Sequence, residues 1–169
     1  MMTQGNALQI LAVAAAAVLA RSVYRRINAF SFEGKSVLIT GGSRGLGLVM
    51  ARQFAREGAK ISICARDDQE LARAREDLRK LGAEVFTVQC DVTNNDEVQQ
   101  MVQAVTKRFG RIDVLVNNAG VIQVGPLEVM TFDDFEQAMK SHFWGPLQTI
   151  LAVLPGMRER GDGRIVNVS

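Results

Sequence analysis

A glycine-rich run directly after a short apolar segment constrains the fold of this chain more than any other feature. The run covers residues 40–47, contains Gly41, Gly45 and Gly47, and follows the apolar stretch 36–39. Glycine reaches positive φ and has no Cβ, so backbone N–H groups and the positive end of a following helix can face a pyrophosphate. The pattern predicts a phosphate cradle between a strand and a helix, and the alternative is an ordinary glycine-rich turn.

Apolar strand-like runs alternate with amphipathic helical segments along the rest of the chain. This alternation is typical of a parallel sheet that is covered by helices on both faces. The sequence predicts strands near residues 36–40, 60–64, 84–89, 113–117 and 164–168. It predicts helices near residues 45–57, 68–81, 95–108 and 131–158. The expected fold class is therefore α/β.

Side-chain patterns within the predicted helices indicate which helix faces are buried. The first helix carries an apolar stripe that consists of Leu46, Val49, Met50 and Phe54. The apolar residues expected on the inner face of the second helix are Leu71, Ala74, Leu78 and Leu81. Thr131 and Asp134 resemble a capping box at the start of the last helix. The pair Gly145 and Pro146 predicts a kink within that helix.

Three further motifs point to a family. Residues 117–120 read Asn-Asn-Ala-Gly after an apolar strand, Asp91 and Val92 follow the third strand, and residues 163–169 read Gly-Arg-Ile-Val-Asn-Val-Ser. Together with Thr-Gly-x-x-x-Gly-x-Gly at residues 40–47, they resemble the short-chain dehydrogenase/reductase family from about Phe32 to Ser169. The resemblance implies a Rossmann-type doubly wound parallel sheet with strand order 3-2-1-4-5, which would be C-terminally incomplete here.

The same resemblance implies an oxidoreductase that moves a hydride between NADP(H) and a small carbonyl or alcohol substrate. Homo-oligomers are compatible with this expectation. A different class remains open, namely a non-catalytic dinucleotide-binding protein or a membrane-associated interaction protein. The two classes differ in whether a catalytic Ser and a Tyr-x-x-x-Lys motif follow Ser169.

The resemblance assigns the cofactor phosphates to the glycine-rich run. The residues concerned are Gly41, Ser43, Arg44, Gly45, Leu46 and Gly47. A serine hydroxyl can donate to a phosphate oxygen, and a guanidinium offers a planar fork for a phosphate monoester. An exposed arginine at the positive end of a helix is electrostatically unfavourable unless an anion binds beside it.

The end of the second predicted strand bears on the choice between NADP and NAD. In dinucleotide folds an acidic residue there bonds the ribose hydroxyls of NAD and repels the extra phosphate of NADP. This chain has Cys64, Ala65 and Arg66 at that point. The cation favours NADP(H). Asp67 and Asp68 argue for NAD, but they suit the N-terminal cap of the next helix better.

Further cofactor contacts follow from the resemblance. Asp91 would bond the exocyclic amine of adenine and Val92 would contact the ring, although Asp91 alternatively caps a turn. Asn118, Ala119 and Gly120 would line the floor beneath the cofactor ribose, since small residues permit close approach. We expect Asn117 instead to tie neighbouring strands together.

The family's catalytic residues have no counterpart in this sequence. The single tyrosine is Tyr24, near the N-terminus, and it has no lysine four residues later. Ser169 matches the first member of a serine doublet whose second member is catalytic in the family. His142 stands where the family has a supporting asparagine, and it could either relay a proton or be a packed structural residue. The chain is expected to be incomplete for catalysis.

Charge and cysteine content exclude several other functions. The formal net charge is +2, and Arg21, Arg25 and Arg26 precede the first acidic residue, Glu33, so the remainder is nearly neutral. A basic face of the kind that binds nucleic acid is not expected. Two cysteines without histidine neighbours make a poor metal site and suit a reduced interior.

The N-terminal segment is predicted to be separate from the α/β domain. We divide the chain into a hydrophobic segment at 1–27, a linker at 28–34 and a truncated NADP-binding domain at 35–169. Residues 5–20 carry no charge and would span about 24 Å as a helix, somewhat less than a bilayer core. They favour a membrane anchor with the arginines on the cytoplasmic side. A packed or amphipathic helix and a cleaved signal peptide are the alternatives.

Overall fold

The computed structural model describes Arg21 and residues 30–168. The chain divides into two units, Met1–Ser31 and Phe32–Ser169, and the second contains the sheet and the helices that cover it. Apart from Arg21, the predicted segment at 1–27 therefore lies outside the described residues, as do residues 28 and 29 of the predicted linker at 28–34. Within the part that is described, no helix is both long and apolar enough to cross a membrane.

Five parallel strands form one sheet, as predicted. The strands are β1 (Ser36–Thr40), β2 (Lys60–Ala65), β3 (Val85–Gln89), β4 (Val114–Asn117) and β5 (Arg164–Asn167). Their spatial order is β3-β2-β1-β4-β5 and every pair is parallel. The predicted strand order 3-2-1-4-5 is thus confirmed. Successive strands are added on one side of β1 up to β3 and on its other side from β4 onward, so the strand order reverses between β1 and β4. Such folds form their ligand crevice at this point.

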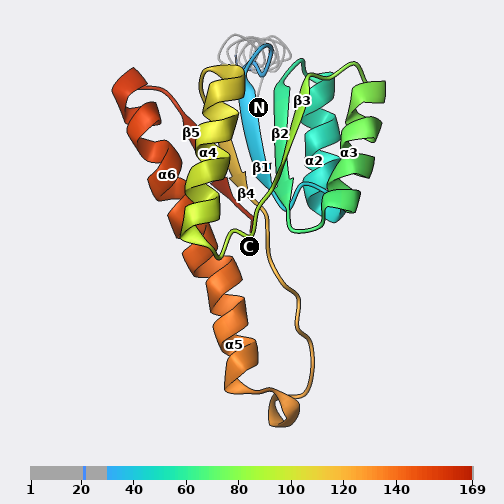
Figure 1. The fold of residues 1–169 in the computed structure, drawn as a ribbon, viewed down its shortest axis with the longest axis vertical. Helices are drawn as coiled ribbons and strands as arrows, with labels where there is room; N and C mark the ends of the chain where they lie inside the picture. Colours follow the sequence, from blue (N-terminus) through green and yellow to red (C-terminus); the bar gives the residue numbers. More distant parts are fainter. Residues whose placement is uncertain (1–20, 22–29, 169) are drawn as a thin grey trace, which may run out of the picture. The chain divides into compact units, whose positions relative to one another are not determined.

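Helices cover both faces of the sheet (Figure 1). Helices α2 (Gly45–Arg56) and α3 (Asp68–Lys80) pack on one face, and α4 (Asn95–Phe109) and α6 (Gly145–Arg160) pack on the other. The core under α4 and α6 contains Leu38, Cys64 and Leu115 from the sheet. The inner strands β1, β2 and β4 are buried on both faces and consist of near-continuous apolar runs, whereas the edge strand β5 is largely exposed.

The predicted apolar stripe of α2 is wrong for Leu46 and Val49, whereas Met50 and Phe54 are half-buried. Leu46 and Val49 are 55% and 54% exposed, and the buried residues of the helix are Gly47, Ala51 and Ala55. Small residues let the helix backbone approach the sheet closely, so the larger side chains of that turn point outward. In α3 the prediction holds for Leu71, Ala74 and Leu78 but fails for Leu81, which lies just past the helix end and is 40% exposed.

The long helix predicted over residues 131–158 is divided into three parts. These are α5 (Phe132–Met139), a π-helical stretch η2 (Lys140–Trp144) and α6. The interruption lies immediately before Gly145 and Pro146, where the sequence predicts a kink, since proline has no N–H for the regular ladder. A short 3₁₀ turn, η1 (Leu127–Val129), precedes α5.

The predicted capping box at the start of α5 is confirmed. Asp134 N–H donates to Thr131 Oγ1, while Thr131 N–H donates to the Asp134 carboxylate at 2.8 Å. The N–H and O–H of Thr131 also lower the pKa of Asp134, because both hydrogen bonds favour the ionised carboxylate. The cap fixes where α5 begins after the loop that follows β4.

Candidate functional site

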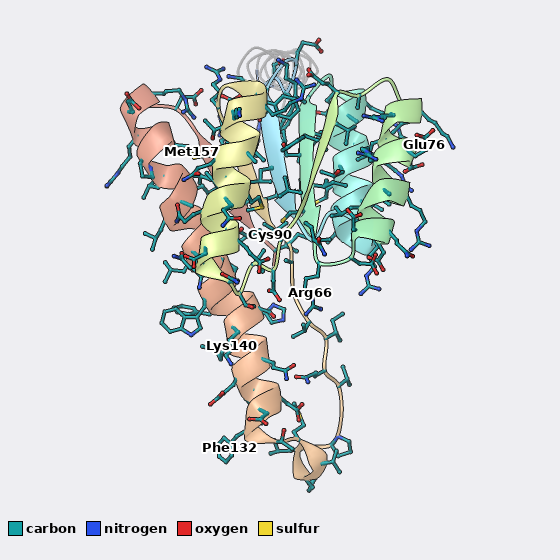
Figure 2. The ribbon with its side chains drawn as sticks, viewed as in Figure 1. Arg66, Glu76, Cys90, Phe132, Lys140 and Met157 are labelled. Carbon is teal, nitrogen blue, oxygen red and sulfur yellow. The ribbon has the colours of Figure 1, made fainter. Side chains whose placement is uncertain are left out.

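A cavity of about 1040 Å³ opens at the carboxyl ends of the strands. Eleven of the twelve predicted cofactor residues line it: Gly41, Ser43, Arg44, Gly45, Leu46, Arg66, Asp91, Val92, Asn118, Ala119 and Gly120. Lining residues that the sequence did not single out as site residues include Cys64, Asp67, Glu70, Cys90, Val121 and Ser141. Figure 2 shows Arg66 and Cys90 at the same end of the sheet.

The glycine run forms a cradle whose shape depends on missing Cβ atoms. Gly41 and Gly45 have φ values of +64° and +55°, which residues with side chains rarely adopt. A Cβ on Gly41 would lie 2.9 Å from the Ala119 Cα. Gly47, the one predicted residue that does not line the cavity, faces the Gly41 carbonyl and the Asn118 side-chain amide, so a Cβ there would collide with both. Gly47 therefore lets α2 pack closely against the cradle without contacting the cavity itself.

Thr40 and Asn118 join the cradle to the loop after β4. The backbone N–H groups of Asn118 and Ala119 each donate to Thr40 Oγ1 at 3.0 Å. In return, Asn118 Nδ2 donates to the carbonyl oxygens of Thr40 and Gly41 at 3.1 and 3.2 Å. Asn118 thus braces the cradle besides lining it, and Thr40 is a positioning residue that sequence reasoning missed although it begins the quoted motif.

We expect Thr40→Val to lower the free energy of unfolding by about 1–3 kcal/mol, because two backbone N–H groups would lose their acceptor in a buried setting. Thr40→Ser keeps the oxygen and should retain most of that stability. Urea unfolding of both variants measures the difference. Equal destabilisation by serine and valine would contradict the bracing role of the hydroxyl.

Asn117 ties neighbouring elements together, as predicted. Its Oδ1 accepts a 2.6 Å hydrogen bond from Thr149 Oγ1 of α6. Its Nδ2 donates to Asn167 Oδ1 of β5 at 2.9 Å. Asn117 is buried and does not line the cavity. Of the two adjacent asparagines, one therefore joins β4 to β5 and α6, and the other braces the cradle.

Asp91 both caps a turn and lines the cavity. Its Oδ1 accepts from the Thr93 N–H at 2.9 Å and from Thr93 Oγ1 at 2.8 Å. The turn is held further by the Asp91 N–H, which donates to Glu97 Oε2 at 2.8 Å. The neighbouring Val92 is buried and packs against Gly145, where a Cβ would come within 3.0 Å of Val92 Cγ2. The start of α6 therefore fixes the position of Val92 at the cavity wall.

A carboxylate from α3 reaches the side chains of the cradle. Ser43 Oγ donates to Glu70 Oε2 at 2.9 Å, and Arg44 Nη1 lies 3.4 Å from Glu70 Oε1. Asp67 accepts from the Glu70 N–H at 2.9 Å and so caps α3, as the sequence predicts. Arg66 forms no salt bridge with any residue that the structure describes. The sequence does not identify Glu70 as a site residue, because its partner Ser43 lies 27 residues away along the chain.

The two cysteines lie beside each other and line the cavity. Both are free and belong to the buried core under α4 and α6, as expected for a reduced interior. A hydrogen bond from Cys64 to Cys90, together with burial and repulsion between the sulfurs, raises the pKa of the Cys64 thiol. The same bond lowers the pKa of the Cys90 thiol. No group of three metal-binding side chains occurs among the described residues.

His142 contacts the loop after β4. One of its ring nitrogens lies 2.8 Å from the Val121 carbonyl oxygen, and the ring sits against Gly120 where a Cβ would otherwise be. The contact connects η2 to the loop that lines the cavity. The His142 side chain is exposed, and of the two roles that the sequence left open for it, this contact with the loop favours the structural one.

Comparison with known proteins agrees with the fold and the motifs. The family model described as short chain dehydrogenase matches residues 35–169. A putative ketoacyl reductase of Streptomyces coelicolor is 35% identical over 139 residues, which are 81% of this chain and 53% of the relative. An uncharacterized oxidoreductase of Bacillus subtilis is 36% identical over 132 residues, 78% of this chain and 51% of the relative. The chain spans about half the length of the curated relatives that it matches.

Two solved structures show the same architecture. NAD⁺-bound xylitol dehydrogenase matches with a TM-score of 0.78 and 34% identity, over 82% of this chain and 54% of that one. Actinorhodin polyketide ketoreductase with NADPH matches with a TM-score of 0.77 and 36% identity, over 80% of this chain and 52% of that one. The strand order, the glycine cradle, the Asn-Asn-Ala-Gly loop and these matches lead to one conclusion: the chain belongs to the short-chain dehydrogenase family.

Proposed function

We propose that this chain is the cofactor-binding part of an oxidoreductase that transfers a hydride between NADP(H) and a carbonyl or alcohol substrate. The observation that carries the proposal is the glycine cradle at the carboxyl edge of the sheet. Its backbone keeps this shape because Gly41 and Gly47 have no Cβ atoms, which would collide with Ala119, with the Gly41 carbonyl and with the Asn118 side-chain amide. Solved relatives that bind NAD⁺ or NADPH support a nicotinamide dinucleotide as the ligand.

The polar groups of the cavity suit the parts of such a dinucleotide. Backbone N–H groups at the start of α2 would hold the pyrophosphate. Ser43, Arg44 and Arg66 line the same cavity and would hold the 2′-phosphate, which is the basis for preferring NADP over NAD. When it is bound, the dinucleotide supplies the hydride chemistry, and the protein binds and orients it.

The remaining lining residues would hold the adenosine half. Asp91 Oδ2 accepts no hydrogen bond from the residues that the structure describes, so it is available to the exocyclic amine of adenine. Val92 offers an apolar contact to the ring. Ala119 and Gly120 leave room for the ribose because their side chains are small or absent.

Calorimetric titration of the chain with NADP⁺ and NAD⁺ tests the proposal. We expect NADP⁺ to bind at least about tenfold more tightly, since one charge-assisted hydrogen bond to the 2′-phosphate contributes roughly that factor. The preference should weaken as ionic strength rises, because both arginines are exposed. Equal or tighter binding of NAD⁺ would contradict the NADP assignment, and binding of neither would contradict the dinucleotide site.

We also expect the chain alone to oxidise no NADPH with a panel of aldehydes and ketones. Its one tyrosine, Tyr24, lacks the lysine partner that the family uses to supply the proton. A spectrophotometric assay of NADPH oxidation measures this directly. Turnover that depends on the protein would contradict the expectation and would require another acid, for which His142 is the candidate.

Membrane association through residues 5–20 stays a prediction from the sequence, because these residues lie outside those that the structure describes. We propose a domain on the cytoplasmic side that this stretch attaches to the membrane. Carbonate-washed membranes from expressing cells should retain the full chain and release a variant that begins at Phe32. Recovery of the full chain in the supernatant would contradict an integral anchor.

A further inference from the structure

Glu70 contacts Ser43 and Arg44, two of the side chains that would hold the 2′-phosphate in the proposed function. Its carboxylate accepts from Ser43 Oγ at 2.9 Å through one oxygen and pairs with Arg44 Nη1 at 3.4 Å through the other. The Glu70 backbone is fixed at the same time, because its N–H donates to the Asp67 side chain. The Glu70 side chain is 23% exposed, whereas that of Arg44 is 80% exposed.

A carboxylate that uses both oxygens in this way presents the same acceptors that a phosphate would present. A 2′-phosphate that enters the cavity must take Ser43 and Arg44 from Glu70 and must then lie close to a second negative charge. Like charges at short range oppose binding, and they oppose it more where the site is partly shielded from water. Arg66 differs, since it has no salt bridge to give up among the described residues.

A dinucleotide without the 2′-phosphate meets a different situation. It carries a ribose hydroxyl at that position, so it can leave the Ser43–Glu70 and Arg44–Glu70 contacts in place. Glu70 therefore opposes one cofactor and not the other, which is how a repulsive element sets specificity.

We propose that Glu70 is a specificity-determining residue that competes with the 2′-phosphate for Ser43 and Arg44 and so narrows the preference for NADP over NAD. The inference rests on the proposed function, because it presumes that the cavity binds the adenosine end of a dinucleotide. It adds to that function an internal anion that the ligand must displace.

The test compares 2′,5′-ADP with 5′-AMP, two probes that differ in the phosphate at issue. Glu70→Gln keeps the size of the side chain and removes its charge. It should tighten binding of 2′,5′-ADP by about tenfold and leave binding of 5′-AMP within about twofold. Asp68→Asn is the matched control, because it removes a charge from the same helical turn at a residue that does not line the cavity. Glu70→Ala repeats the comparison if the glutamine variant folds poorly.

A second background tests the competition itself. In a protein that carries Ser43→Ala and Arg44→Gln, Glu70→Gln should improve 2′,5′-ADP binding clearly less than in the unaltered background, because the groups over which the anions compete are gone and only the repulsion by the Glu70 charge is relieved. The inference is overturned by an equal gain for 5′-AMP, by the same gain from Asp68→Asn, or by weaker 2′,5′-ADP binding in Glu70→Gln. Failure of the unaltered chain to bind either probe would instead overturn the proposed function, and this inference with it.

Discussion

Gly47→Ala is expected to lower dinucleotide affinity by about an order of magnitude or more and to lower the free energy of unfolding by about 1–3 kcal/mol. The new Cβ would meet the Gly41 carbonyl and the Asn118 amide, which are the groups that hold the cradle against the loop after β4. The Gly41 carbonyl is part of the backbone, and the Asn118 amide is held by hydrogen bonds to the carbonyls of Thr40 and Gly41, so the cradle itself must open. Calorimetric titration with NADP⁺ and urea unfolding measure the two effects.

Gly82→Ala is the control for this change, because it adds a Cβ away from the cradle. Unlike Gly47, Gly82 has a positive φ, of +81°, but a Cβ there meets open space and the residue does not line the cavity. The control should cost about 1–2 kcal/mol of stability through backbone strain and leave affinity unchanged. A Gly47→Ala protein that binds NADP⁺ as the unaltered chain does would show that the cradle is not the ligand site.

Arg66→Asp should reverse the cofactor preference. It removes a cation that is free to meet the 2′-phosphate and substitutes a carboxylate that can bond the ribose hydroxyls of NAD. Loss of a charge-assisted hydrogen bond costs about 1.5–3 kcal/mol before screening, and repulsion adds to it. Parallel titrations with NADP⁺ and NAD⁺ measure the reversal.

Arg75→Asp is the control for Arg66→Asp. It makes the same charge change at an exposed position of α3 that does not line the cavity. A similar loss of NADP⁺ affinity in both variants would mean that overall charge, and not the position of Arg66, sets the preference. Unchanged preference in Arg66→Asp would remove Arg66 from the site.

The sequence predicted the arrangement of the elements because those signals are local. Glycine punctuation, apolar runs and caps such as Thr131 with Asp134 each lie within a few residues of the element that they define. The strand order followed from the family resemblance and is confirmed. The predicted site residues came together because the carboxyl ends of parallel strands meet at one edge of the sheet.

The failures arose where packing overrides local pattern. The hydrophobicity of Leu46 and Val49 indicated an inner stripe, but the small residues of α2 approach the sheet and turn these side chains outward. Thr40 and Glu70 were missed because their partners lie 78 or 79 and 27 residues away, respectively. A pattern within one segment contains no information about such partners, which only the folded chain brings together.

A crystal structure of the chain with NADP⁺ tests the central claim most directly, since it locates both phosphate groups of interest. We expect the pyrophosphate on the backbone of the glycine cradle and the 2′-phosphate within hydrogen-bonding distance of Ser43, Arg44 and Arg66, with the Glu70 carboxylate displaced from Ser43. A nucleotide bound outside this cavity, or one whose 2′-phosphate faces away from all three side chains, would contradict it.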